Sequence, residues 1–136
     1  MRPFLAASQA AAVAVTIIVA VIPAGAQTEA RPALPAAVST GAGYGDARQA
    51  LLDAGWRPQP TAECASNMGA GLEKLCQTLP ETEACSGDGY CNFHFQRDGG
   101  WLLTITTYGD YNRALDRGRN TGINIETLDM TRSRSE

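Results

Sequence analysis

The chain has 136 residues, of which 44% are hydrophobic and 18% charged, and its formal net charge is −3. That length is enough for one domain and too short for two. The mildly acidic charge excludes the clustered basic surface expected of a nucleic-acid-binding protein.

Residues 1–26 have the pattern of a cleavable secretory signal peptide. A start with one arginine precedes an apolar centre at residues 10–22, Pro23 ends that centre, and Ala24-Gly25-Ala26 offers the small residues that a signal peptidase accepts. A membrane anchor is the alternative, but the apolar centre is shorter than the roughly 20 residues that span a bilayer. We therefore expect cleavage after this segment, a mature charge of −4 once its arginine is removed from the −3 total, and no membrane insertion of the mature part.

The mature chain begins with a stretch that lacks any periodic apolar pattern. Residues 27–43 are rich in Pro, Ala, Gly and Ser, and we interpret them as a flexible linker. We expect a single domain over residues 44–130 and a disordered tail over residues 131–136.

The first predicted element is a helix over residues 44–54. Tyr44 and Leu51 share one helical face, and Gly55 follows as a helix-ending residue. Trp56 then precedes an Arg-Pro pair that favours extended backbone. We expect Trp56 to pack in the core.

Four cysteines lie in the middle of the mature chain: Cys64, Cys76, Cys85 and Cys91. An even number in a small exported chain predicts two disulfides. Of the three connectivities we favour Cys64–Cys76 and Cys85–Cys91, because each closes a short loop. Structural zinc sites use C-x₂₋₄-C pairs, whereas these cysteines are separated by eleven, eight and five residues. We therefore predict no metal ion and no cofactor.

The strongest strand pattern covers residues 90–108. Residues 90–96 alternate with Phe93 and Phe95 on one face, Asp98-Gly99 is a favoured hairpin turn, and the return strand follows to Tyr108. Weaker signals predict three further elements: a short helix before Pro80, a helical turn at 112–117 and a short edge strand at 123–125. The sequence therefore predicts an α+β domain, with one main helix on a three- to four-stranded antiparallel sheet stapled by disulfides.

Several of these segments together form a recognisable pattern: Tyr44-x-x-Ala47-Arg48-x-x-Leu51, Gly55-Trp56-x-Pro58, Pro80-Glu81, Cys85-x-Gly87, Cys91-x-Phe93-x-Phe95 and Asp98-Gly99. The pattern covers about residues 44–108 and resembles a group of small exported bacterial proteins. This resemblance implies a common scaffold with the Cys85–Cys91 link and assigns no catalytic residue. Cys64, Cys76 and the residues beyond Gly109 lie outside the pattern.

The residue types needed for catalysis are scarce. His94 is the single histidine, which excludes a catalytic pair or a metal site built on two histidines of one chain. Glu81 and Glu83 are two residues apart, and paired carboxylates can hydrolyse glycosides. A charged loop between the disulfides is the interpretation that we favour, so we predict no catalytic residue.

The hairpin face opposite the phenylalanines is the candidate partner-binding surface, and it carries Tyr90, Asn92, His94 and Tyr108. If the main helix covers the phenylalanine face, these residues stay at the surface, where tyrosines favour protein recognition. The alternative is that the second helix or the tail covers them.

Our leading hypothesis is a secreted or periplasmic binding or accessory domain, with an envelope or extracellular protein as its partner. The alternatives are a structural envelope protein without a specific partner and a carboxylate-based hydrolase. An exposed patch of Tyr90 and Tyr108 favours binding, whereas a deep cleft holding Glu81, Glu83 or His94 favours catalysis.

Overall fold

The alternating segment that predicts a hairpin forms the centre of the structure, a computed structural model that describes residues 30–69, 71–111 and 122–133. The expected signal peptide at 1–26 and the expected helical turn at 112–117 lie outside the described residues.

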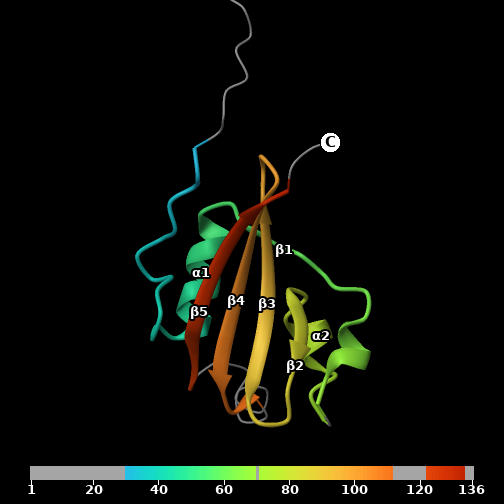
Figure 1. Cartoon of the computed structure of the whole chain (residues 1–136). Coiled ribbons are helices and arrows are strands. Elements are labelled where there is room, and N and C mark those ends of the chain that lie inside the picture. Colours follow the sequence, from blue (N-terminus) through green and yellow to red (C-terminus); the bar gives the residue numbers. More distant parts are fainter. Residues whose placement is uncertain (1–29, 70, 112–121, 134–136) are drawn as a thin grey trace, which may run out of the picture.

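One main helix packs on one face of an antiparallel sheet (Figure 1). The helix α1 spans Tyr44–Asp53, where the sequence predicted residues 44–54. The five strands of the sheet are β1 (Arg57–Pro58), β2 (Thr82–Cys85), β3 (Tyr90–Arg97), β4 (Trp101–Gly109) and β5 (Ile123–Arg132). The predicted α+β class is confirmed, and the sheet has one strand more than the upper limit expected.

Strand β3 is the central strand of the sheet and pairs with β1, β2 and β4. The strand order is β1-β3-β4-β5, and β2 also pairs with β3. In the β3–β4 hairpin, Arg97 lies opposite Trp101 beside the turn, and Tyr90 lies opposite Tyr108 at the far end. The two tyrosines therefore stand at the end of the sheet furthest from the hairpin turn.

The core lies between α1 and the sheet. Tyr44 of α1 stacks on Phe93 of β3, with their ring centroids 4.1 Å apart. Phe95 from the same strand face and Leu103 from β4 are fully buried. Trp56 is 1% exposed, which confirms that it belongs to the core. The phenylalanine face is thus the covered face of the hairpin.

A small disulfide-linked unit connects β1 to β2. It contains the 3₁₀ helix η1 (Cys64–Asn67) and the short helix α2 (Leu75–Thr78). The Cys64–Cys76 disulfide joins these two helices, and the Cys85–Cys91 disulfide joins β2 to β3, where the two cysteines are register partners. Both predicted disulfides are confirmed.

The ordered domain extends beyond the expected bounds of 44–130 at both ends. Within residues 27–43, interpreted as a linker, Val38 is 5% exposed and belongs to the core. The Gly41 N–H donates to the Ile125 carbonyl at 2.7 Å, and the Ile125 N–H donates to the Ala42 carbonyl at 2.9 Å. This backbone pairing with β5 needs no side-chain periodicity, so the apolar pattern does not reveal it. Strand β5 also continues to Arg132, two residues into the stretch 131–136 that was expected to be a tail.

Within the described residues, no helix combines the length and the apolar character needed to cross a membrane.

Candidate functional site: the open face of the sheet

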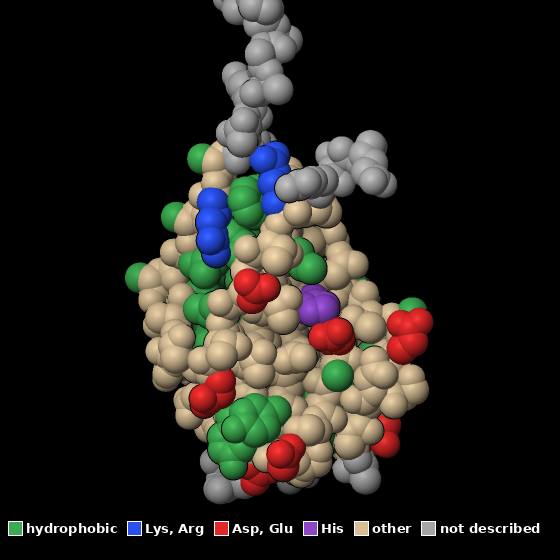
Figure 2. Space-filling view, viewed as in Figure 1, with side chains coloured by type: hydrophobic (Ala, Val, Ile, Leu, Met, Phe, Trp, Pro, Cys, Tyr) green, Lys and Arg blue, Asp and Glu red, His purple; other side chains and the backbone are tan. Residues whose placement is uncertain are grey.

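The sheet face opposite α1 is open in the described part of the chain. Figure 2 shows this face, with an apolar patch at its lower end. Tyr90 and Tyr108 are the large hydrophobic residues exposed on the described surface, at 46% and 48% of their full area. The described residues of α2 and of β5 leave both rings accessible to solvent.

The backbone around the two tyrosines brings their rings together. Tyr90 and Tyr108 are register partners, and their ring centroids lie 4.9 Å apart at an interplanar angle of 50°. Gly89 has a φ of +102°. It lies in the turn before β3, which is closed by a hydrogen bond from the Ser86 N–H to the Tyr90 carbonyl at 2.8 Å. A Cβ at Gly89 would lie 3.2 Å from the Tyr108 ring and 3.1 Å from the Gly109 carbonyl oxygen. Glycine at this position therefore lets the Tyr108 ring lie close to the turn.

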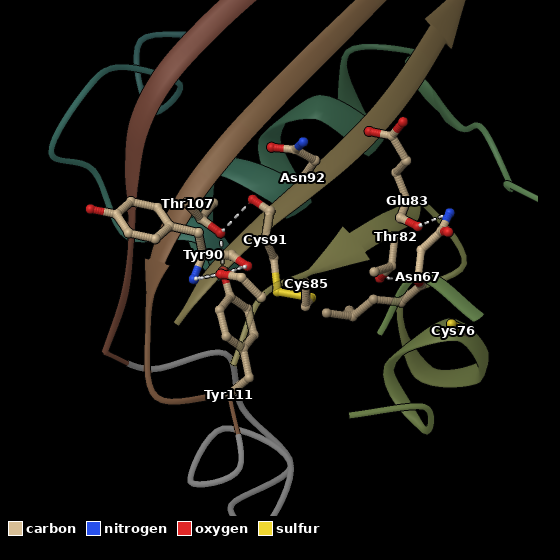
Figure 3. The surroundings of a disulfide bond; sticks show 12 residues. Asn67, Cys76, Thr82, Glu83, Cys85, Tyr90, Cys91, Asn92, Thr107 and Tyr111 are labelled. Carbon is tan, nitrogen blue, oxygen red and sulfur yellow. Dashed lines mark hydrogen bonds between the residues drawn. A yellow bond between two sulfur atoms is a disulfide. The ribbon is translucent and has the colours of Figure 1, made fainter. Parts of the chain in front are cut away.

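The inner side of the same strand ends is pinned beneath the tyrosines (Figure 3). Cys91 is held by its disulfide, and the buried Thr107 hydroxyl donates to the Cys91 carbonyl at 3.3 Å. Thr107 also hydrogen-bonds to the Tyr111 hydroxyl. Burial raises the pKa of Tyr111 well above its usual value, so this hydroxyl stays protonated. The backbone below the exposed tyrosine pair is thus held by a disulfide and by hydrogen bonds.

Asn92 and His94 continue the row along β3. The Thr106 hydroxyl donates to Asn92 Oδ1 at 2.9 Å across the β3–β4 pair. His94 Nε2 lies 3.2 Å from Glu83 Oε2, and these side chains are 17% and 35% exposed. The structure therefore brings all four predicted surface residues to one face, with the tyrosines projecting furthest into solvent.

Glu81 does not belong to this surface. Its side chain is fully buried, and Tyr44 Oη donates to Oε1 at 2.9 Å. Arg48 donates from Nε to the same Oε1 and from Nη2 to Oε2 at 3.2 Å. The carboxylate is therefore satisfied by two groups of α1. Glu81 lies in the turn before β2, in agreement with the loop interpretation, but its side chain is buried and faces the helix.

The two donors show the electrostatic effect of this buried cluster. Burial, reinforced by the negative charge of Glu81, raises the pKa of the Tyr44 hydroxyl well above its usual value. The hydrogen bond to Glu81 raises the pKa of Arg48. The sequence analysis did not predict this cluster, although Tyr44, Arg48 and Glu81 all occur in the sequence pattern described above.

A hollow of about 520 Å³ adjoins the tyrosine patch. Its lining includes Asp88, Tyr108, Asp110 and Asn124, and among its described lining residues there is none of Glu81, Glu83 and His94. The described residues also contain no group of three or more His, Cys, Asp and Glu side chains placed to hold a metal ion. The structure does not bring the candidate catalytic side chains together in a cleft.

No family model, curated protein or solved structure matches this chain. Its function is therefore inferred from the geometry of the open face.

Proposed function

We propose that the chain is an exported binding or accessory domain, which recognises an envelope or extracellular protein through its open sheet face. The exposed pair of Tyr90 and Tyr108 carries this proposal. Tyrosine has few rotatable bonds and a polar hydroxyl on a large apolar ring, so it contributes strongly to protein interfaces at a low entropic cost. A fixed backbone beneath the rings lowers that cost further.

The positions of the acidic side chains favour binding over hydrolysis. A carboxylate-based hydrolase needs two carboxyl groups facing one substrate-sized cleft. Glu81 is fully buried against Arg48, whereas Glu83 lies on the sheet beside His94. One carboxylate is thus inaccessible to substrate, which supports a binding role.

Export is supported by two independent features. The pattern of residues 1–26 predicts a signal peptide, and the two disulfides belong to the kind of chain that matures in an oxidising compartment. The resemblance to small exported bacterial proteins agrees with this placement. Residues of that pattern also build the buried cluster of Tyr44, Arg48 and Glu81, as expected of scaffold positions.

Site-specific photo-cross-linking in cells tests the proposal. A photoreactive residue at Thr127, which lies opposite Thr106 on the open face, should yield one dominant adduct with a protein partner. The matched control position is the exposed Gln49 on α1, where we expect no such adduct. The double variant Tyr90→Ala/Tyr108→Ala should abolish the Thr127 adduct while its circular dichroism stays unchanged. Equal labelling from both positions, or an adduct that survives in the double variant, would refute recognition through this face.

A further inference from the structure

We propose that the segment bound by the open face is cationic, a lysine- or arginine-rich stretch of the protein partner. This inference rests on the proposed function and adds the chemistry of the partner. It follows from the distribution of charge around the two tyrosines, from the ring geometry and from the net charge of the chain.

On β3, β4 and β5 the open face carries acidic residues and no lysine or arginine. Arg57 of β1, the register partner of Gln96, shares this face at the end beside the hairpin turn. The strand positions that alternate outward are Tyr90, Asn92, His94 and Gln96 of β3, Leu102, Thr104, Thr106 and Tyr108 of β4, and Asn124, Glu126, Thr127, Asp129 and Thr131 of β5. Figure 2 shows acidic side chains on either side of the apolar patch. Among the described residues, a positively charged partner segment would therefore meet acidic side chains beside the tyrosine pair.

Carboxylates flank the tyrosine pair on two sides. Asp88 is exposed in the turn just before Tyr90 and lines the hollow that Tyr108 also lines. On the other side, Asn124 is the register partner of Tyr108, and the exposed Glu126 follows two residues along β5. Asp88 is thus two residues from Tyr90, and Glu126 is two residues from the register partner of Tyr108. Residues two apart on a strand are separated by roughly 7 Å, which is within the screening length of about 8 Å at physiological salt.

The arginines of the sheet are grouped at the opposite end and have partners there. Arg57 forms an ion pair with Asp98 at 2.8 Å. The Arg97 guanidinium lies 6.0 Å from the centre of the Trp56 ring, and the Arg132 guanidinium lies over the Trp101 ring. Seven residue steps separate the two ends of β3, roughly 23 Å at strand spacing. That separation exceeds the screening length of about 8 Å at physiological salt, so these arginines do not neutralise the tyrosine end.

The rings themselves favour a cation. The face of an aromatic ring carries partial negative charge and attracts an ammonium or guanidinium group. Tyr90 and Tyr108 are tilted by 50° to each other and are each about half exposed, so a lysine or arginine side chain can reach a ring face while its charge meets a neighbouring carboxylate. One lysine or arginine side chain of the partner would then make apolar contact with the rings and pair its charge with a carboxylate.

Charge also decides against a second copy of this chain as the occupant. A symmetric dimer through this face would place Glu126 and Asp88 of each copy against the same acidic patch of the other. Residues 1–26 contain one of the 11 basic residues and none of the 14 acidic ones. After cleavage of this segment, the mature chain would therefore have 10 Lys and Arg against 14 Asp and Glu. Self-association would therefore be opposed by like charges, whereas a basic segment is attracted.

Titration of the exported, oxidised protein with two short peptides tests this inference. An alternating Ser-Arg decapeptide should shift backbone amide resonances near Tyr90, Tyr108 and Glu126, and the alternating Ser-Glu decapeptide should shift none of them. Raising NaCl from 50 to 300 mM should weaken Ser-Arg binding by about threefold or more. Shifts confined to other surfaces, or binding that does not depend on salt, would overturn the cationic assignment.

Charge variants separate this inference from the proposed function. Asp88→Asn and Glu126→Gln should each weaken Ser-Arg binding by about threefold, whereas Asp53→Asn on α1 is the matched control and should leave it unchanged. If Asp88→Lys/Glu126→Lys leaves the Thr127 adduct intact and the Ser-Arg peptide does not bind, the cationic assignment fails and the proposed function stands. If neither the adduct nor peptide binding is found, both fail.

Discussion

At the residue scale, Glu81 is the charged side chain that is fully buried among the described residues. Its carboxylate is fully buried and is compensated by Arg48 and Tyr44. A buried ion pair adds little net stability relative to apolar residues, but a charge left without its partner is costly. The contribution of this cluster is therefore revealed by removing one member at a time.

Arg48→Met should lower the free energy of unfolding by about 3–5 kcal/mol, because it leaves the Glu81 carboxylate buried without its cation. The double variant Arg48→Met/Glu81→Leu should recover a large part of that loss, since neither charge then remains. Urea unfolding followed by tryptophan fluorescence measures both values, with the exposed Glu73→Gln as control. A loss below 1 kcal/mol in Arg48→Met would contradict a buried ion pair.

The raised pKa of Tyr44 predicts a loss of stability at alkaline pH. The unfolded tyrosine ionises near pH 10, whereas burial and Glu81 keep the folded hydroxyl protonated to higher pH. Above pH 10 the unfolded state therefore binds fewer protons than the folded state, and stability falls as pH rises, by up to about 1.4 kcal/mol per pH unit for each such tyrosine. This stabilising term is fully present below pH 10.

Tyr44→Phe should flatten the alkaline loss, measured as unfolding free energy between pH 8 and 10.8. Tyr111 contributes a loss of the same sign, because burial raises its pKa too. The slope should therefore decrease in Tyr44→Phe without vanishing. An unaltered slope in Tyr44→Phe would show that this hydroxyl is not held protonated by the fold.

The sequence could not predict that Glu81 is buried. Its partners Tyr44 and Arg48 are 37 and 33 residues away in the chain, so no local spacing connects them. A glutamate after proline in an aperiodic stretch has solvent as its ordinary environment. By contrast, Trp56 and the phenylalanines were placed correctly, because a large apolar side chain beside a periodic element has few positions other than the core.

At the element scale, local signals were sufficient where they were strong. Helix α1 and the β3–β4 hairpin lie where the apolar period and the Asp-Gly turn predicted them. Strand β2 was missed because it has four residues and is defined by pairing with β3. Strand β5 is longer than predicted, since a register shift opposite Thr106 and Thr107 changes the phase of its alternation after Ile125.

The two disulfides stabilise different elements. Removing Cys64–Cys76, with a sequence separation of 12, should cost about 3 kcal/mol, and removing Cys85–Cys91, with a separation of 6, about 2.4 kcal/mol in the chain-entropy model. Paired Cys→Ser variants and thermal unfolding measure these costs. The first variant should leave the amide resonances of the β3–β4 hairpin in place, because its disulfide lies outside the sheet. Collapse of the hairpin signals in that variant would contradict this separation.

At the scale of the whole molecule, the fold divides its surfaces by role. Helix α1 and the buried cluster occupy one side of the sheet, and the tyrosine pair occupies the other. The scaffold and the proposed binding face therefore share strands but use opposite side-chain rows. Substitutions of the outward row should change binding with little effect on stability, and substitutions of the inward row should do the reverse.

The disulfides also link the stability of the whole domain to the proposed export. Together they are worth about 5 kcal/mol in the chain-entropy model, and small domains have only about 5–15 kcal/mol in total. A chain held in a reducing compartment would therefore lose about a third or more of that stability. The proposed export and the folding of the domain are thus expected to depend on each other.

Ala24→Asp/Ala26→Asp in the proposed signal peptide should block cleavage, because the small residues that the peptidase requires are lost. The unaltered chain should yield a mature protein that starts at Gln27 and lacks four thiol hydrogens, as measured by intact mass after cell fractionation. Ala33→Asp, in the exposed stretch after the cleavage site, is the control and should be processed normally. Processing of the double variant at the same bond, or a mature mass with all four thiols reduced, would contradict the proposed route of export and oxidation.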